Sequence, residues 1–274
     1  DYWEEPIRKL GIPLHAVPQK SNRFFRLLEI IRILKPYHPA LIQGWHLFAS
    51  PYAGAAATLL GAKSLGGLRD MVATFWKHAT EARLTLWFTD GILANSKSAA
   101  GDLEACQVRK KQRIFAVQNA VCPDLINRSE SRNSLDPENR FSPKPIWIGT
   151  INRLDRKKRL ELYIELAALY QGSKDIHFFL IGDGPQRSEL EALADKLGVR
   201  EMVTFTGEIP MASRLLPAFD VLCFTSTDEG MPNVILEAAA AAVPVVAGRF
   251  TFTEEVLIDH ETGLLGEPGE TSSL

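Results

Sequence analysis

Two glutamates, Glu229 and Glu237, lie eight residues apart around the expected start of a helix. Pro232 suits the first helical position, which leaves Glu237 one turn inside the helix. Helical side chains tilt toward the N-terminus, so Glu237 should lean back under Asn233 toward the mouth of the helix. Glu229 lies in the loop that leads to the same mouth. Both carboxylates can therefore face one ligand.

The expected helix mouth is also suited to an anion. Free backbone N–H groups around Gly230, Met231, Pro232 and Asn233 combine with the positive end of the helix dipole, and this combination favours a phosphate. A phosphate would repel a nearby carboxylate, so the two glutamates are better suited to accept hydrogen bonds from sugar and ribose hydroxyls. Each charge-assisted bond of this kind contributes roughly 1.5 to 3 kcal/mol. The alternative is an acidic loop followed by an ordinary surface glutamate.

Two cations follow the expected strand 146–151. Arg153 and Lys158 lie just after it, at the carboxyl edge where open α/β sheets bind ligands. They could supply the positive charge that a bound diphosphate requires. The run 153–159 is equally consistent with a solvated, highly charged turn, so these two residues alone decide nothing.

Several catalytic motifs are absent from the sequence. The six histidines form no HxH or HExxH pair, no GxSxG elbow occurs, and no Asp-x-Asp pair is present to hold a divalent metal on a diphosphate. The turn Gly182-Asp183-Gly184-Pro185 could cradle a phosphate, but Arg187 replaces the third glycine of a GxGxxG dinucleotide motif. We therefore expect no metal and no cofactor, and protein cations must neutralise any diphosphate.

Strands and helices that alternate along the second half position these residues. Short β-branched or aromatic runs alternate with amphipathic stretches from residue 146 onward, which predicts a parallel sheet covered by helices in a Rossmann-like domain. The expected strands are 146–151, 176–181, 203–206, 221–224 and 245–247. The expected helices are 160–170, 185–197, 213–219 and 233–242.

The first half predicts a second, less regular α/β domain. Its expected elements are helices over 24–34 and 51–60, a long helix ending near 89, and strands over 40–44, 91–94 and 114–117. Residues 127–145 are dense in Asn, Ser, Arg, Glu and Pro, so we expect an exposed linker there and domains at 1–143 and 144–274. The first segment enters partway through an α/β unit and the last stops after a turn-rich stretch, so we expect truncation at both ends.

Charge is unevenly distributed along the chain. Lys and Arg outnumber Asp and Glu by 19 to 13 in residues 1–143, whereas the counts are 12 and 20 in residues 144–274. The basic half suits an anionic membrane surface, but its charges are scattered and lack interleaved aromatics, which argues against nucleic acid. The three cysteines form no CxxC pair, no signal segment is visible, and the longest uncharged apolar stretch, 47–62, is too short to span a bilayer. We expect a cytoplasmic protein with a peripheral contact at the inner face of the membrane.

Taken in order, the motifs resemble those of retaining glycosyltransferase family 4, the group-1 glycosyltransferases of the GT-B fold. The family's Arg-Leu-x-x-x-Lys, Gly-x-Gly-Pro and Phe-x-Gly patterns are similar to residues 153–158, 182–185 and 205–207. Its Glu-Gly-x-Pro-Asn-x-x-x-Glu-Ala signature is similar to 229–238, its Pro-Val-Val to 244–246, and its closing pattern to 255–256 and 261–265. The resemblance is strong over 146–265 and loose over 1–143, where it rests on 91–96 and 117–121.

The resemblance implies a role for each candidate residue. Arg153 and Lys158 would grip the donor diphosphate, Glu229 would contact the transferred sugar, and Glu237 would hold the ribose hydroxyls. Gly207 and Ile209 would lie near the base. The implied reaction moves a hexose from a nucleoside diphosphate sugar to a glycan or lipid-linked acceptor, with retention and without a metal, in a cleft between two Rossmann-like domains. The alternatives are a nucleotide-sugar epimerase or hydrolase, and a non-catalytic donor-binding fragment.

One departure from the family pattern concerns the acceptor side. Family members often have a histidine near the active site, whereas the corresponding stretch here is similar to Gly66-Gly67-Leu68-Arg69. His46 is the substitute candidate for that histidine.

Overall fold

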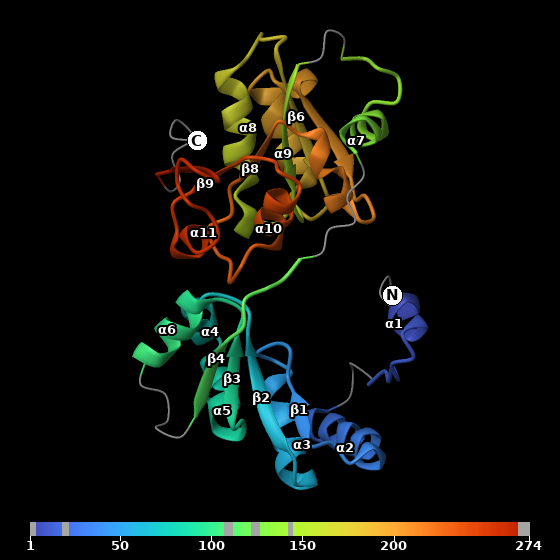
Figure 1. Cartoon of the computed structure of the whole chain (residues 1–274), viewed down its shortest axis with the longest axis vertical. Coiled ribbons are helices and arrows are strands. Elements are labelled where there is room, and N and C mark those ends of the chain that lie inside the picture. The colour runs from blue at the N-terminus through green and yellow to red at the C-terminus, as the bar shows by residue number, and fades with distance from the viewer. Residues whose placement is uncertain (1–3, 18–21, 107–111, 122–126, 142–144, 268–274) are drawn as a thin grey trace. The chain divides into compact units, whose positions relative to one another are not determined.

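The computed structural model describes residues 4–17, 22–106, 112–121, 127–141 and 145–267, and these residues form two compact units. The first unit contains residues 1–94 and 99–117, and the second contains residues 95–98 and 118–274. Each unit is an α/β domain built on one parallel sheet (Figure 1). The sequence-based expectation of two α/β domains with mostly parallel sheets is therefore confirmed.

The first unit has a four-stranded sheet with strand order β1-β2-β3-β4, all parallel. The strands are β1 (Leu41–Gln43), β2 (Lys63–Leu68), β3 (Gly91–Ala94) and β4 (Arg113–Ala116). The helical elements are α1 (Glu4–Lys9), α2 (Arg23–Leu34), η1 (Lys35–Tyr37), α3 (Ser50–Leu60), α4 (Val72–Lys77), α5 (Ala79–Phe88) and α6 (Lys97–Ala105). Helix α3 lies close to its neighbours, because a Cβ on Gly54 would come within 2.6 Å of the Phe88 carbonyl oxygen.

Two elements of this unit differ from the sequence-based expectation. Strand β2 was not expected, because Gly66 and Gly67 give it low intrinsic strand propensity, and its pairing with both β1 and β3 stabilises it. The long helix expected to end near residue 89 is two helices, α4 and α5. The backbone of His78 leaves the helical region between them, with φ −107° and ψ 58°.

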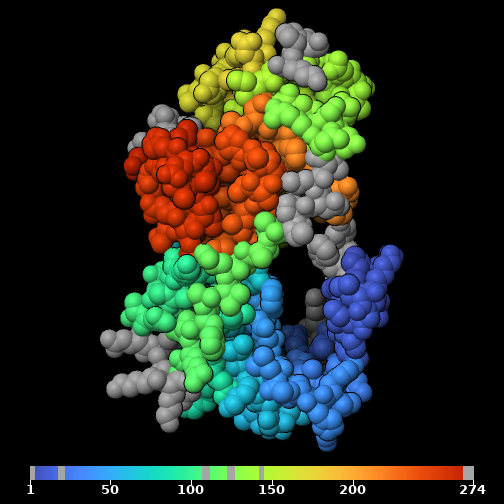
Figure 2. All heavy atoms as spheres, in the orientation of Figure 1, coloured from blue at the N-terminus to red at the C-terminus, as the bar shows by residue number. Residues whose placement is uncertain are grey.

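The second unit has a six-stranded parallel sheet with strand order β10-β9-β8-β5-β6-β7. The strands are β5 (Ile146–Ile151), β6 (Ile176–Ile181), β7 (Val203–Gly207), β8 (Val221–Phe224), β9 (Val245–Gly248) and β10 (Gly263–Gly266). The helical elements are α7 (Arg128–Leu135), η2 (Arg156–Lys158), α8 (Leu160–Leu169), α9 (Arg187–Lys196), η3 (Arg200–Met202), η4 (Ala212–Ala218), α10 (Asn233–Ala240) and α11 (Thr251–Glu254). The C-terminal elements from β9 onward form the red surface of this unit in Figure 2.

The strand order of this sheet determines where a ligand can bind. The chain builds outward from β5 through β6 to β7, and then returns to the other side of β5 with β8, β9 and β10. The order reverses between β5 and β8, and such a switch point leaves a crevice at the carboxyl ends of the two strands. The crevice is the expected binding position in this Rossmann-type topology.

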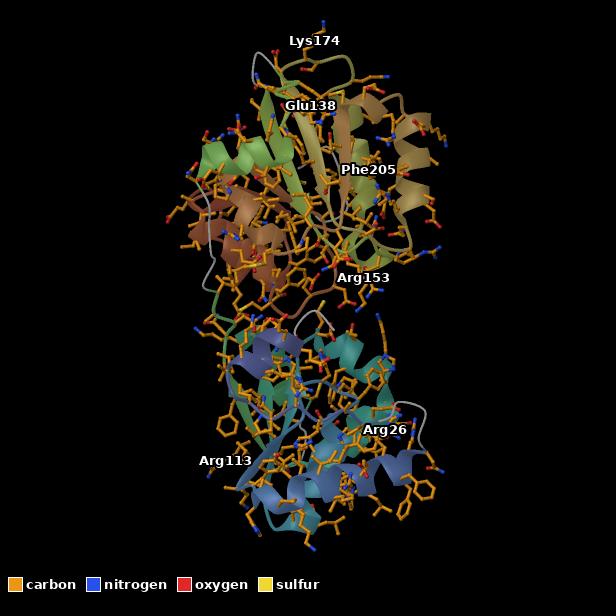
Figure 3. All side chains as sticks on the ribbon, turned by 90° about the vertical axis from the view of Figure 1, so that its right-hand side faces the viewer. Arg26, Arg113, Glu138, Arg153, Lys174 and Phe205 are labelled. Atoms are coloured by element: carbon orange, nitrogen blue, oxygen red, sulfur yellow. The ribbon has the colours of Figure 1, made fainter. Side chains whose placement is uncertain are left out.

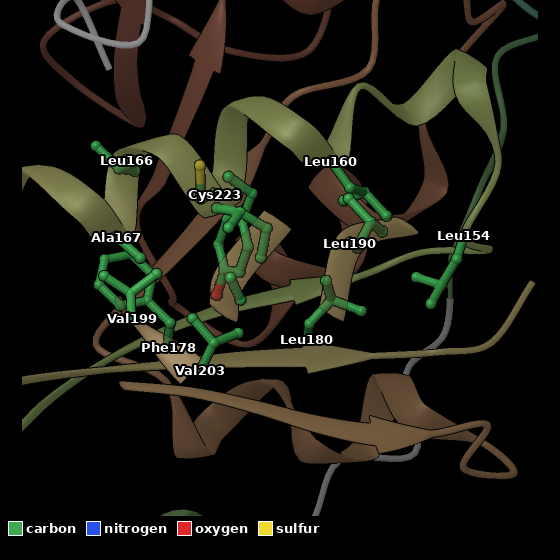
Figure 4. Close-up of a cluster of buried hydrophobic side chains, with 13 residues drawn as sticks. Leu154, Leu160, Leu166, Ala167, Phe178, Leu180, Leu190, Val199, Val203 and Cys223 are labelled. Atoms are coloured by element: carbon green, nitrogen blue, oxygen red, sulfur yellow. The ribbon is translucent and has the colours of Figure 1, made fainter. Parts of the chain in front are cut away.

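The core of the second unit lies between α8, α9 and the sheet. Leu160, Leu166 and Ala167 of α8 pack over Phe178 and Leu180 of β6 (Figure 4). The hydroxyl of the fully buried Tyr163 lies 2.8 Å from the carbonyl oxygen of Ile148 and 3.0 Å from that of Phe179, so its one hydrogen is shared between two neighbouring strands. These contacts tie α8 to β5 and β6, and thereby fix the turn that precedes α8.

Helix α7 corrects the expected linker. Residues 127–145 were expected to form an exposed linker between the domains. Most of the described residues there are exposed, but α7 packs against η4 and belongs to the second unit, whose continuous part begins at residue 118. The Arg132 guanidinium donates to the Asp220 carboxylate (2.6 Å) and lies 4.6 Å from the centre of the Trp147 indole. The same carboxylate accepts from the backbone N–H of Trp147 (2.8 Å). The polar composition suggested a linker, but Arg132 of α7 pairs with Asp220, and the helix is therefore part of the domain.

An aromatic cluster closes the amino-terminal end of the second sheet. The ring centre of Phe141 lies 4.1 Å from that of His177 and 5.9 Å from that of Trp147. Burial lowers the pKa of His177 to about 4, and its Nε2 lies 2.8 Å from the Thr204 hydroxyl. This histidine is a packed core residue. Among the described residues, no helix is long and apolar enough to cross a membrane.

Candidate functional site

The candidate site lies where β5 and β8 end beside each other. The turn after β5 is held by Asp155, whose carboxylate accepts from the backbone N–H of Lys157 (3.1 Å). Its carbonyl oxygen accepts from the backbone N–H of Lys158 (3.0 Å). Arg159 then adopts a left-handed conformation, with φ 49°, and α8 begins. A charged stretch of sequence thus becomes a defined turn that presents Lys158 at the sheet edge.

The Lys158 ammonium forms an ion pair with Oε1 of Glu229. Both side chains are about one-fifth exposed, at 21% and 20%. The Ser226 hydroxyl, 2.8 Å away, donates to the same carboxylate oxygen. Because the ammonium carries three donors and the carboxylate accepts at two oxygens, each group keeps capacity for a ligand. The pair therefore presents a cation and an acceptor side by side.

The loop after β8 is bonded to the turn after β5. The Thr225 hydroxyl donates to the Lys158 carbonyl oxygen (2.6 Å). The Ser226 hydroxyl, whose single hydrogen is shared with the shorter contact to Glu229, also lies 3.2 Å from the Lys157 carbonyl oxygen. The Lys157 ammonium also lies 3.8 Å from the Asp228 carboxylate. These bonds connect residues about 70 positions apart and hold the ion pair in one arrangement.

Helix α10 begins at Asn233, with Pro232 as the preceding cap residue. Met231 is buried, and its carbonyl oxygen accepts from the side-chain amide of Asn119 (3.3 Å). The same amide donates to Oδ1 of Asn233 (2.7 Å). The backbone N–H of Asn119 lies 3.2 Å from Sδ of Met231. Asn119 thus orients the loop 230–233, and the sequence-based site residues did not include it.

Glu237 lies in the second turn of α10 and is half-buried. Burial raises the pKa of this carboxyl group, because ionisation is less favourable away from water. A half-buried carboxylate gains most from hydroxyl donors that replace the lost water. This environment suits the expected contact with ribose hydroxyls, and that role stays a prediction.

A pocket of about 510 Å³ lies at the carboxyl ends of β5, β6 and β7. Its lining includes Arg153, Gly182, Glu208 and Ile209. Figure 3 shows Arg153 at one end of this sheet and Lys174 at the opposite end. The structure therefore brings two of the expected residues, Arg153 and Ile209, to one pocket.

Two glycines lie at this edge of the sheet, and one of them, Gly182, lines the pocket. Gly182 has φ 134°, and a Cβ there would overlap the carbonyl oxygen of Asn152. Gly207 has φ 76°, and it pairs with Ile181 after a register shift between β6 and β7. The backbone N–H of Gly182 donates to the Gly207 carbonyl oxygen (2.9 Å). Glycine favours both conformations, and at Gly182 the overlap with Asn152 leaves no room for a side chain.

The carboxyl edge of the first sheet carries its own polar groups. The Arg69 guanidinium lies 4.7 Å from the ring centre of Trp45, which is 56% exposed. A Cβ on Gly67 would come within 2.5 Å of the Trp45 carbonyl oxygen. His46 is exposed, and its carbonyl oxygen accepts from the Ser50 hydroxyl (2.8 Å). The stretch that corresponds to the family's histidine therefore ends in Arg69, whose guanidinium lies over the exposed Trp45 indole.

The cysteines and the possible metal-binding side chains are the remaining reactive groups. Cys106 is exposed and Cys223 is buried, and burial raises the pKa of the Cys223 thiol to about 12. Cys122 lies outside the described residues. Across the described ranges, no group of three or more His, Cys, Asp or Glu side chains lies close enough together to hold a metal ion.

The chain belongs to the glycosyl transferases group 1, whose family model matches residues 131–274. It is 24% identical over 256 residues to the lipopolysaccharide core biosynthesis glycosyltransferase LpsD of Rhizobium meliloti, covering 92% of this chain and 68% of LpsD. It is 34% identical to LpsE of the same organism over 45% of this chain and 35% of LpsE. It is 31% identical to the alpha-D-kanosaminyltransferase of Streptomyces kanamyceticus over 72% of this chain and 51% of that protein. The chain thus spans about a third to two thirds of these relatives.

Solved structures share the fold. HepE of Anabaena, solved in complex with UDP and glucose, matches the whole chain and 77% of its own length, with a TM-score of 0.82 and 19% identity. The lipopolysaccharide outer core galactosyltransferase WaaB, solved in the apo form, matches 91% of this chain and 69% of its own, with a TM-score of 0.64 and 19% identity. The α/β architecture with two mainly parallel sheets is thus the GT-B fold, as the motifs predicted.

Proposed function

We propose that this protein transfers a hexose from a nucleoside diphosphate sugar to a glycan or lipid-linked acceptor, with retention of configuration and without a metal ion. The observation that carries this proposal is the Lys158–Glu229 pair at the switch point of the second sheet. A cation and an acceptor at adjacent positions match the two halves of a sugar diphosphate. The relatives whose names state a glycosyltransferase activity support the same reaction class.

The diphosphate of the donor is assigned to the cations and the helix mouth. Lys158 keeps ammonium donors beyond the one shared with Glu229, and the start of α10 adds free backbone N–H groups of its first turn. Arg153, from the neighbouring pocket, supplies a guanidinium suited to phosphate oxygens. These groups replace the positive charge that other enzymes take from a divalent ion.

The carboxylates are assigned to hydroxyl groups of the donor. Glu229 accepts from hydroxyls of the transferred sugar, and Glu237 accepts from the ribose. The pocket of about 510 Å³ beside Gly207 and Ile209 has the volume of a small-molecule site, so we assign the base to it. Backbone groups there, exposed by the two glycines, would select the base.

The reaction breaks the bond between the anomeric carbon and the diphosphate oxygen. The acceptor oxygen forms the new glycosidic bond on the same face of the sugar, and its proton passes to the leaving diphosphate. Lys158 and Arg153 stabilise the negative charge that develops on that diphosphate. No protein base is then required on the acceptor side.

Names of related proteins support the substrate class. HepE has been solved with UDP-glucose, and LpsD is named for lipopolysaccharide core biosynthesis. The excess of Lys and Arg in residues 1–143 suits an acceptor attached to an anionic membrane. We therefore infer a glycan or lipid-linked sugar as acceptor, a cytoplasmic location, and a peripheral contact through this half.

A donor screen tests the proposal. Calorimetry with UDP, GDP and ADP sugars should identify a donor that binds, and Lys158→Ala and Glu237→Ala should each weaken it by about 10-fold or more. Transfer to an acceptor mixture should follow with a chelator present, and the product should keep the donor's anomeric configuration. Unchanged affinity of both variants for every donor would sink the site assignment. Isomerised or hydrolysed sugar from donor alone would instead indicate an epimerase or hydrolase.

A further inference from the structure

A second pocket, of about 360 Å³, lies in the first unit among helices α2, α3 and α5. Its walls are mainly apolar and include Leu27, Tyr52, Ala55, Leu84 and Phe88. We call it the helical groove. Its outer edge is unusually apolar for a surface, since Phe88 is 37% exposed and Leu84 is 36% exposed. The donor chemistry proposed above makes no use of it.

The helical groove is elongated and has one polar end. Glu81, Leu84 and Phe88 occupy one face of α5 over two turns, so the groove extends about 10 Å along that helix. Arg23 and Arg26 line it from the first turn of α2. The charged residues thus lie in the N-terminal turns of their helices, and Phe88 lies at the opposite end.

The polar end of the groove points to the ligand-binding edge of the sheet. Helix α3 directly follows β1 and α5 precedes β3, so in a parallel α/β layer the first turns of both helices lie at the carboxyl edge. Phe48, from the loop after β1, also lines the groove. That loop carries the exposed Trp45 at the same edge. A molecule with its head group at this edge would lay its tail between the helices.

The charges at the polar end favour an anion. Arg23 lies 3.5 Å from Glu81, but its side chain is 78% exposed, so this ion pair is weakly held and can reorganise. The Arg26 guanidinium lies over the Tyr52 ring, 5.8 Å from its centre (Figure 3 labels Arg26). Two guanidinium groups and one carboxylate are the charged groups among the residues that line the groove, and guanidinium matches the geometry of phosphate oxygens.

We propose that the helical groove binds the hydrocarbon chain of an anionic amphiphile, with the phosphate of that amphiphile held by Arg23 and Arg26. This inference rests on the proposed function, and it specifies the acceptor as a lipid-linked phosphate whose sugar reaches the edge beside Trp45. The hydrocarbon chain and the phosphate of the ligand bind to different parts of one site, so neither part of the ligand alone gives full affinity.

Calorimetry on the whole chain with dodecyl phosphate below its micelle concentration tests the groove. Butyl phosphate is the control ligand that lacks the long hydrocarbon chain, and dodecyl maltoside is the control ligand that lacks the negative charge. Dodecyl phosphate should bind at least about 10-fold more tightly than either probe. Ala55→Phe, which fills the groove from α3, should weaken dodecyl phosphate by about 10-fold or more, whereas Leu59→Phe on an exposed part of the same helix should not.

The charge half of the site needs its own variants. Arg23→Gln combined with Arg26→Gln should reduce dodecyl phosphate affinity to that of dodecyl maltoside, whose own affinity stays unchanged. Arg83→Gln, an exposed arginine of α5 outside the groove, is the matched control. If Ala55→Phe melts early by circular dichroism, Leu84→Ser replaces it, since this change removes apolar wall at an exposed position.

Distinct results would overturn the proposal. Equal affinity for dodecyl and butyl phosphate, or full affinity in folded Ala55→Phe and Leu84→Ser, would exclude the groove as a chain site. Binding to anionic vesicles without binding of monomeric dodecyl phosphate would indicate adsorption to a surface instead. Donor affinity measured on the same samples separates the two proposals, because intact donor binding without dodecyl phosphate binding rejects only the groove. Binding of dodecyl phosphate without binding of any nucleotide-sugar donor rejects only the transfer function.

Discussion

Replacing Lys158 with methionine removes the ammonium group that bonds to Glu229 and keeps most of the apolar length of the side chain. Both side chains are about one-fifth exposed, so the pair lies between surface ion pairs, worth up to about 1 kcal/mol, and buried ones, whose disruption costs about 3 to 5 kcal/mol. The Ser226 hydroxyl continues to donate to the orphaned carboxylate. We therefore expect the free energy of unfolding to fall by about 2 kcal/mol.

The effect on ligand binding separates the two halves of the site. Loss of one charge-assisted bond to a phosphate corresponds to about 1.5 to 3 kcal/mol, or roughly a 10- to 150-fold weaker affinity for the nucleoside diphosphate. Glu229→Gln keeps the shape but removes the charge that shares the ammonium. It should leave affinity for the nucleoside diphosphate equal or higher, and weaken only the nucleotide sugar.

Calorimetric titration of both variants with UDP, GDP and ADP and with their sugar derivatives measures this pattern. Arg156→Met, an exposed residue of the same turn, is the control and should change neither ligand. Wild-type affinity of Lys158→Met for every nucleoside diphosphate would refute the assignment of Lys158 to the diphosphate. Parallel losses in Glu229→Gln for the diphosphate and for its sugar would refute the assignment of Glu229 to the sugar.

Three further predictions concern neighbouring parts of the site. Asn119→Ala frees the loop around Met231, so nucleotide-sugar affinity should fall by about 3- to 10-fold in calorimetry, and an unchanged value would remove Asn119 from the site. Gly182→Ala should lower the free energy of unfolding by about 3 kcal/mol or more in urea melts. The control Gly172→Ala should lower it by only about 1 kcal/mol, because Gly172 has φ 84° but no atom within 4 Å of a new Cβ. Equal losses in the two variants would contradict the steric argument. Because burial raises the pKa of Glu237, its ionised form destabilises the fold at pH values above that pKa. Glu237→Gln should therefore raise the melting temperature at neutral pH but not at acidic pH. It should also abolish any fall in donor affinity that accompanies protonation of this carboxylate as the pH is lowered. A pH-dependent affinity that persists in the glutamine variant would assign that titration to another group.

Most of the second sheet was predictable because its strands are short β-branched or aromatic runs separated by clear breaks. The five expected strands begin where the structure has them and end within two residues of the observed ends. The sixth strand, β10, was not expected as a strand, since its two leucines lie between two glycines and gain their pairing only from β9. Intrinsic strand propensity does not predict a strand whose formation depends on pairing with a neighbouring strand.

The positions of the candidate site residues in the fold were predictable, but the contacts between them were not. Sequence patterns placed Lys158 and Glu229 each at the carboxyl end of a strand. Their direct contact across 71 residues follows from the position of β8 beside β5, which strand order alone determines. Ser226 was not among the expected site residues, and Asn119 lies in 117–121, where the family resemblance is only loose. A second signal for Asn119 is that it closely follows a strand-like run, at the edge where ligand-binding residues gather.

The packing of α7 determines where the second unit can be cut from the rest of the chain. A fragment that starts at residue 144 would discard Arg132 and leave the Asp220 carboxylate and the Trp147 indole without the guanidinium that covers both. It would also discard Asn119, which orients the helix mouth. A fragment that starts near residue 118 keeps these contacts, so protein engineers who want an isolated nucleotide-sugar module, or who exchange such modules between enzymes, should join the chains before residue 118.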